Sequence, residues 1–312
     1  MVENNDFVKM EIDGVKFKLR EKADFSFLQQ YGKVFCVFDQ NDSGNISFGI
    51  ENELKEKYFI KVAGAKTLEA FCQPDEAVKA LKHTIRIYQE LRCEILIDMI
   101  TFGTFQNLFF VVFRWSDGEC LFDHWNFDFY QSNPKIKSPR EKFSDLSEKK
   151  KLQVADQILQ FMTHVEEKEY IAVDFYDGSL MYDFDRNQLT ICDIDFFQRK
   201  PVINNIGIEY WGAKRMKAPE EYILGAKINS KTNVFTVGAL FFHLFGNYSN
   251  KMITKMDKEN QFIPLQKEYW ELPMQLYDIV LKAVNPFPEK RYETIRSLKE
   301  EWLTQCDKLY SC

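Results

Sequence analysis

Between about residue 12 and residue 62, apolar and polar residues alternate with a period of two. Four short segments carry this pattern: 15–19, 33–38, 45–50 and 57–63. Such alternation predicts strands with one buried face, and the turn residues between the segments favour hairpins. We therefore expect an antiparallel sheet in this part of the chain.

The next part of the chain combines one helix with two more strands. Residues 74–91 repeat apolar residues at three- and four-residue spacing behind Pro74, which predicts an amphipathic helix. Residues 95–103 and 107–115 each predict a strand. The second of these strands is so apolar that we expect both of its faces to be covered.

Helical patterns dominate after Trp115. Amphipathic segments are found at 145–165, 275–284 and 292–303. Residues 232–246 are apolar nearly all round, which predicts a buried helix. The sequence thus predicts an α+β protein in which a strand-rich half is followed by a helix-rich half.

Composition and charge narrow the class of protein. The chain has 312 residues, of which 45% are hydrophobic and 29 are Phe, so it can bury a large core in about two domains or lobes. The net charge of −6 gives no broad attraction to nucleic acid or to an anionic membrane. The run from Lys149 to Lys151 falls in a predicted helix, where we expect it to form a solvated face. No nucleic-acid or membrane partner is expected.

The cysteines and the N-terminal segment predict the compartment. The seven cysteines form no CxxC pair and are odd in number, which argues against a disulfide framework and favours a reducing environment. The N-terminal segment lacks the apolar stretch of a signal peptide, and no run approaches 18 uninterrupted apolar residues. We expect a cytoplasmic protein.

The sequence of residues 39–51 is similar to that of a calcium-binding loop. Asp39 and Asn41 fall at the first and third positions of such a loop, but its twelfth position, which needs a bidentate acid, is Ile50. Because strand-like alternation flanks the segment, a hairpin turn is the better interpretation.

The most unusual placement of acids is in residues 171–197, IAVDFYDGSLMYDFDRNQLTICDIDFF. Asp174, Asp177, Asp193 and Asp195 stand among residues suited to buried strands. Buried carboxylates require a cation, a metal or a hydrogen-bond network. A loop followed by a hairpin would bring Asp174 and Asp193 to one mouth, as phosphoryl transfer requires for orienting a hydroxyl and holding Mg²⁺. A structural hairpin with solvated acids is the alternative.

The order of several degenerate motifs resembles the protein-kinase superfamily over roughly residues 23–305. QQYGKVFCV is similar to the end of a glycine-rich loop, YFIK looks like the third-strand V-A-I-K, and LFFVVFRWSDGE resembles the strand and hinge that hold adenine. Further along, AVDFYDGS resembles H-R-D-L-K-P-E-N, DID resembles D-F-G, and WGAKRMKAPEE resembles the segment that ends in A-P-E. NPFPEKR resembles the segment whose arginine pairs with the A-P-E glutamate, here Arg291 with Glu220.

This resemblance implies a bilobal protein kinase-like fold. It would be a divergent, bacterial-looking member of the eukaryotic-type serine/threonine kinase fold, with ATP and Mg²⁺ as cofactors. Residues 1–114 would form the N-lobe, with the sheet and one helix, and residues 115–312 would form the helical C-lobe.

The resemblance also implies site residues. The nucleotide-binding residues would be Gly32, Val34, Lys61, Val112, Phe113, Trp115 and Asp117. Lys61 would position the α- and β-phosphates, and Asp174 would orient the acceptor hydroxyl. The metal would be held by Asp193 with Ser179 or Asp195.

Departures from the family pattern leave three functions open. Ala172 and Val173 replace the histidine and arginine before Asp174, and Glu76 is the substitute we find for the usual glutamate partner of Lys61. A serine/threonine protein kinase is the first choice. A small-molecule phosphotransferase of the aminoglycoside or choline kind is the second, and a catalytically silent nucleotide-binding scaffold is the third.

Overall fold

The computed structural model describes residues 7–70, 72–122 and 126–310. The chain divides into two compact units, Met1–Ser116 and Asp117–Cys312. Helices account for 39% of the structure and strands for 22%, and the sheets are antiparallel. The α+β class expected from the sequence is confirmed.

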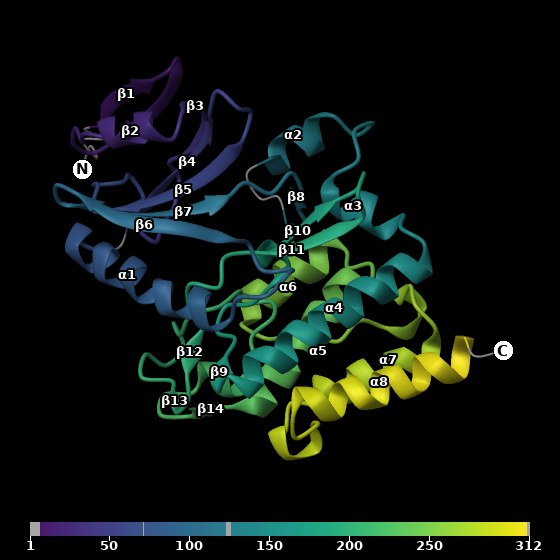
Figure 1. Cartoon of the computed structure of the whole chain (residues 1–312). Coiled ribbons are helices and arrows are strands. Elements are labelled where there is room, and N and C mark those ends of the chain that lie inside the picture. Colours follow the sequence, from purple (N-terminus) through teal and green to yellow (C-terminus); the bar gives the residue numbers. More distant parts are fainter. Residues whose placement is uncertain (1–6, 71, 123–125, 311–312) are drawn as a thin grey trace. The chain divides into compact units, whose positions relative to one another are not determined.

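A five-stranded antiparallel sheet forms the centre of the N-terminal unit (Figure 1). Its strands, in spatial order, are β3 (Lys33–Phe38), β4 (Asn45–Glu51), β5 (Lys57–Ala63), β7 (Leu108–Arg114) and β6 (Met99–Phe105). Strands β3, β4 and β5 follow the alternating segments of the sequence, and the expected hairpin turn over residues 39–44 joins β3 to β4. Strand β6 begins at Met99 rather than at residue 95.

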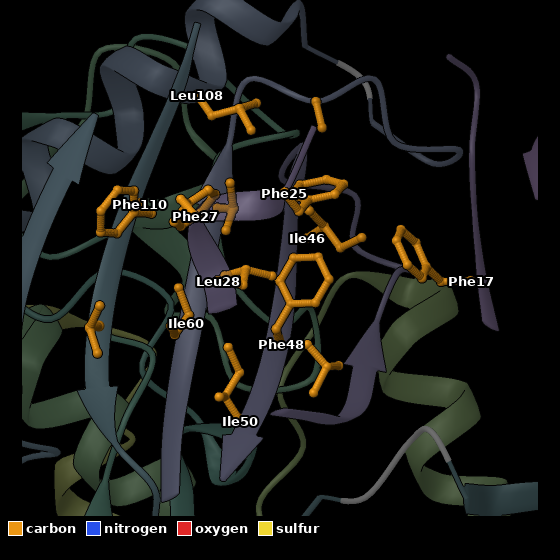
Figure 2. Packing of buried hydrophobic residues seen from close by; sticks show 14 of the residues in the cluster. Phe17, Phe25, Phe27, Leu28, Ile46, Phe48, Ile50, Ile60, Leu108 and Phe110 are labelled. Carbon is orange, nitrogen blue, oxygen red and sulfur yellow. The ribbon is translucent and has the colours of Figure 1, made fainter. Parts of the chain in front are cut away.

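Both faces of this sheet are covered. On one face, β1 (Val8–Ile12), β2 (Val15–Leu19) and the 3-10 helix η1 (Ser26–Gln30) enclose the apolar cluster of Figure 2, which includes Phe48 and Ile60. On the other face, helix α1 (Pro74–Glu90) packs against β5 and β7. The expected burial of β7 on both faces is confirmed, because every residue from Leu108 to Phe113 is buried.

The C-terminal unit is mainly helical (Figure 1). Its helices are α2 (Phe127–Ser132), α3 (Pro139–Ser144), α4 (Glu148–Glu167), α5 (Ser230–Leu244), α6 (Asn250–Glu259), α7 (Met274–Ala283) and α8 (Ile295–Tyr310). Helix α5 is buried from Thr232 to Leu244 and contacts α4, α7 and α8, so the expectation of a central apolar helix is confirmed. None of the helices in the described part of the chain is long and apolar enough to cross a bilayer.

Small antiparallel sheets in the C-terminal unit position its loops. Their strands are β8 (Glu119–Cys120), β10 (Leu180–Asp183) and β11 (Gln188–Ile191) in one sheet, β9 (Tyr170–Ile171) and β12 (Gln198–Arg199) in a second, and β13 (Val202–Ile203) and β14 (Lys227–Ile228) in a third. Short 3-10 helices lie at η3 (Asp177–Ser179), η4 (Pro219–Tyr222), η5 (Lys267–Tyr269) and η6 (Pro288–Lys290). The acid-rich segment of the sequence therefore lies in the loop between β9 and β10 and in the residues that follow β11.

Candidate functional site

The loop 172–179 connects β9 to β10 and is anchored at its start by a buried asparagine. The Asn233 Oδ1 atom accepts a hydrogen bond from the Ala172 backbone N–H (2.9 Å), and its Nδ2 atom donates to the Tyr170 carbonyl (3.1 Å). Asn233 belongs to α5 and is completely buried. The central helix of this unit thus positions the loop just before Asp174.

Asp174 and Asp193 share an uncommon backbone conformation. Their φ angles are 58° and 51°, in the left-handed region that Asp tolerates better than most residues other than glycine. The Cys192 N–H donates to the Ser179 carbonyl (2.9 Å), which joins the end of the loop to the residue before Asp193. The candidate metal residues Ser179 and Asp193 are therefore neighbours.

The Tyr176 phenol is affected by the charges of several of these acids. Burial raises the pKa of the Tyr176 phenol well above its ordinary value, and the negative charges of Asp193, Asp174 and Asp177 raise this pKa further. The negative charges of Asp174 and Asp193 thus act on the same phenol. The phenol remains protonated at neutral pH and can serve as a hydrogen-bond donor there.

The candidate metal residues differ in accessibility. Asp193 is exposed and Asp195 is partly buried, whereas Ser179 is completely buried and its Oγ atom accepts a long hydrogen bond from Tyr176 N–H (3.5 Å). Within the described ranges, no group of three or more His, Cys, Asp or Glu side chains could hold a metal ion. In sites that transfer phosphate, Mg²⁺ is usually bound by one or two carboxylates together with substrate phosphates.

A buried ion pair connects this loop to the segment that precedes the A-P-E motif. The Arg215 Nη2 atom lies 2.6 Å from the Asp177 Oδ1 atom, and both side chains are buried. In the same segment, Lys217 is buried and donates through Nζ to the Tyr210 carbonyl (2.5 Å). Burial lowers the pKa of Lys217.

The A-P-E segment carries two buried glutamates that differ in their direct partners. Arg291 binds both carboxylate oxygens of Glu220, at 2.7 and 2.9 Å, so the pairing expected from the sequence is confirmed. Glu221 has no such partner in direct contact among the described residues; it accepts a hydrogen bond from Ala218 N–H (2.7 Å). Burial raises the pKa of Glu221 to about 8, and the negative charge of Glu220 adds to the effect.

In the N-terminal unit, Lys61 lies on β5 and faces the side of the sheet that α1 covers. Successive residues of a strand point to opposite faces, so Lys61 is opposite in direction to Ile60, which belongs to the apolar cluster. Phe113 pairs with Phe59 on the Lys61 face, and its ring meets the Tyr88 ring of α1 edge on at 4.8 Å. Phe113 therefore shares a face with Lys61.

Val34 and Val112 are not placed where the resemblance expects them. Both are buried in the apolar cluster with Ile60, on the face opposite to Lys61. The resemblance implies that Val34 and Val112 contact the same nucleotide as Lys61, and this prediction is wrong. A shift of one residue in a strand reverses the face of every side chain, and Val112 is one residue before Phe113, which shares the face of Lys61.

Gly32 and Glu76 also have other roles than expected. Gly32 precedes β3 with φ 132°, and a Cβ atom there would lie 2.3 Å from the Glu51 carbonyl oxygen, so this glycine permits close backbone approach. Residues 33–37 of the segment that resembles a glycine-rich loop belong to β3, and residues 39–44 form the turn that joins β3 to β4. The Glu76 carboxylate accepts from Gln73 N–H (2.9 Å) and caps α1, so it is not placed as the partner of Lys61.

Trp115 and Asp117 lie at the end of one unit and the start of the next. Trp115 donates its N–H to the Lys57 carbonyl (3.1 Å), and its ring packs against Phe35 at 5.0 Å. Asp117 is exposed and forms an ion pair with Arg186 of the β10–β11 turn (3.1 Å). A contact between Asp117 and a ribose stays a prediction.

No pattern in the sequence indicated a role for Arg215, Lys217 or Glu221. The need for a cation was indicated, because a buried acid such as Asp177 in an apolar segment requires one. Nothing in the order of residues, however, identifies which of many basic residues supplies it.

Comparison of the sequence with protein-family models and with curated proteins finds no match. The assignment of a function to this site therefore depends on its residues and their geometry.

Proposed function

We propose that this protein is an ATP- and Mg²⁺-dependent phosphotransferase with a hydroxyl group as acceptor, and that the acceptor is a serine or threonine of a protein. One observation carries the proposal. Ser179 and Asp193 lie at one end of the β10–β11 hairpin, Asp174 belongs to the loop that leads into this hairpin, and the negative charges of Asp174 and Asp193 both act on the Tyr176 phenol. This is the set of groups that phosphoryl transfer requires around the reacting atoms.

In this proposal each acid has a separate task. Asp174 orients the acceptor hydroxyl and takes its proton. Asp193 and the partly buried Asp195 would hold Mg²⁺, which neutralises phosphate charge when it is bound. Lys61 would contact the phosphates of the nucleotide.

The bilobal protein kinase-like fold is part of the same proposal. Its support is the separation into two units, an antiparallel sheet with α1 between its third and fourth strands along the chain, and a helical unit around the buried helix α5. Support for a protein acceptor comes from the bidentate pair of Glu220 and Arg291. In the resemblance, this pair belongs to the form of the C-lobe that protein kinases have.

A small-molecule acceptor is the second candidate. The observation that favours it is the pair of Asp193 and Asp195, both at least partly accessible and separated by one residue. In the resemblance, an acid at the position of Asp195 is a feature of small-molecule kinases.

A thermal-shift titration with ATP, with and without Mg²⁺, is the first test. Nucleotide that binds only the folded protein should add about 2.7 kcal/mol of stability at a hundredfold excess over Kd. Asp193→Ala should reduce the part of this shift that depends on Mg²⁺. The matched control is Asp185→Asn, an exposed acid in the turn of the same hairpin, which should behave as wild type.

The second step of the test separates the acceptors. Transfer of labelled phosphate to a generic protein and to an aminoglycoside is measured under conditions in which the nucleotide binds. Transfer to protein supports the first choice, and transfer only to the small molecule supports the second. Binding without any transfer would support the silent scaffold, and no shift at millimolar nucleotide would contradict all three.

A further inference from the structure

The ion pair of Arg215 with Asp177 is enclosed by aromatic rings as well as buried. Arg215 is 3% exposed and Asp177 is 5% exposed. The guanidinium carbon of Arg215 lies 4.2 Å from the centre of the Phe122 ring and 6.0 Å from that of the Tyr176 ring. The guanidinium group is thus fixed by a charge-assisted hydrogen bond and by two ring faces, and water has little access to compete.

This pair joins two segments that both flank Asp174. Asp177 follows Asp174 by three residues in the loop 172–179. Arg215 belongs to residues 211–218, which also approach Asp174, because a Cβ atom on Gly212 would lie 3.9 Å from the Asp174 Cα atom. The ion pair therefore ties the loop that carries the candidate catalytic acid to the segment beside it.

Two other basic groups near the pair do not replace Arg215. Burial lowers the pKa of His243 well below its ordinary value, and the charges of Arg215 and Arg140 lower it further, so this imidazole is neutral. Arg140 donates through Nη2 to the Gly246 carbonyl (2.6 Å). In the described part of the chain, Arg215 is the cation that contacts Asp177 directly.

We infer that Arg215 and Asp177 are positioning residues that hold segment 211–218 against loop 172–179, so that the acceptor side of the site is assembled in the free, unmodified protein. The inference rests on the proposed function in one respect, namely that Asp174 orients the acceptor hydroxyl. Neither residue touches the reacting atoms in this proposal. Removal of either partner leaves a buried charge without compensation, which the local structure relieves by opening toward water.

Hydrogen–deuterium exchange of the full chain, without ligand, tests this inference. In Arg215→Met and in Asp177→Asn, amide exchange in residues 176–179 and 211–218 should accelerate about tenfold, the scale of one lost hydrogen bond to a charged group. Exchange in α4 and α8 should not change. The matched control is Arg296→Met, which removes an exposed ion pair with Glu167 (2.5 Å) and should leave exchange in both segments as in wild type.

A variant series separates positioning from general stability. Arg215→Lys keeps the charge and should give exchange between wild type and Arg215→Met, because an ammonium group lacks the planar fork. The double variant Arg215→Met/Asp177→Asn should open the two segments no more than either single variant, since one interaction is lost in all three. If Arg215→Met does not fold, Arg215→Lys and Asp177→Asn provide the measurement.

Exchange does not depend on activity, so the two proposals can fail separately. Wild-type exchange in both segments of Asp177→Asn, or equal acceleration in α4 and α8, would overturn the positioning role and leave the proposed function standing. Where transfer is measurable, Asp177→Asn should lower kcat about tenfold and leave the Kd of the nucleotide unchanged. A change of nucleotide Kd with kcat intact would also overturn the inference.

Discussion

The two units bury different kinds of side chain. In the N-terminal unit, the described buried side chains are apolar apart from four uncharged polar residues, and Figure 2 shows rings and aliphatic groups filling one face of the sheet. In the described residues of the C-terminal unit, the buried set includes the ionisable residues Lys151, Asp177, Arg215, Lys217, Glu220, Glu221 and Arg291.

This difference shows which unit depends more on exact side-chain geometry. Apolar burial is non-directional and can be satisfied by many arrangements of similar volume. A buried charge is stable only with a partner in one geometry, because its desolvation must be compensated. Of this set, Asp177 belongs to the loop with Asp174, and Arg215 and Lys217 belong to the segment beside that loop, so part of this exact positioning occurs where we propose chemistry.

The comparison of the two units predicts that the largest effect of a single substitution is on the rate of phosphate transfer. Asp174→Asn preserves the shape and the backbone preference of the residue but removes its charge. Turnover should fall about 10²- to 10⁴-fold, the usual scale for a positioned acid or base, while nucleotide affinity stays nearly intact. The comparison variant is Asp193→Ala, which should weaken Mg²⁺-dependent nucleotide binding itself. Equal activity of Asp174→Asn and wild type would remove catalysis from this loop.

Arg291→Met should cause the largest loss of folding stability. Arg291 is the partner of both Glu220 oxygens and also donates through Nε to the Asn285 carbonyl (2.6 Å). Its removal leaves Glu220 buried and uncompensated, at a cost of about 3 to 5 kcal/mol. Urea denaturation measures this change. Arg296→Met, at an exposed ion pair, should cost at most about 1 kcal/mol. Equal small losses in the two variants would contradict the importance of buried charge.

The pH dependence of stability offers a smaller but more specific effect. The pKa of Glu221 is about 8 in the folded protein, against 4.5 for the ordinary value. Between these values the folded state holds a proton that the unfolded state has released, so this residue makes stability fall as pH rises, by at most about 1.4 kcal/mol per pH unit. Below pH 4.5 its contribution is complete.

Glu221→Gln should remove this part of the pH dependence. The free energy of unfolding of the variant and of wild type should agree near pH 5 and diverge toward pH 8, with the variant more stable. Both proteins share every other titrating group, so their difference isolates Glu221. Parallel curves over this range would mean that the carboxylate is ionised throughout in the folded protein.

The smallest effect is predicted in the apolar cluster of the N-terminal unit. Ile60→Val removes one methylene group from a completely buried side chain and should cost about 0.5 to 1.5 kcal/mol. The loss should be the same at low and high salt, because no charge is involved. Ile100→Val, at a position that is 42% exposed, should change stability very little. A salt-dependent loss at Ile60 would contradict the distinction between the units.

Much of the fold follows from local patterns. Period-two alternation predicted β3, β4 and β5, and an apolar stretch predicted α5, because these patterns reflect burial of one face or of all faces. The pattern failed for Lys151, which was expected to be solvated. Helical spacing places it with Ala155 and Ile158 on the buried side of α4, where it pairs with Glu271 (2.8 Å).

The site was less predictable, for a physical reason. The order of motifs indicated Glu220 with Arg291, which the structure confirms. Arg215 and Asp177 are 38 residues apart, and neither local periodicity nor residue type indicates that they meet. The side-chain face at Val112 depends on register to within one residue, which alternation does not determine in a strand that is apolar throughout.

The covering of the sheet in the N-terminal unit decides how the chain can be shortened. Removal of residues 7–30 would take away β1, β2 and η1 and expose the side of the sheet that carries Phe48 and Ile60. A broad apolar sheet surface in water promotes association between molecules. The first hairpin is therefore an integral part of this unit, and a fragment that begins at the five-stranded sheet should aggregate.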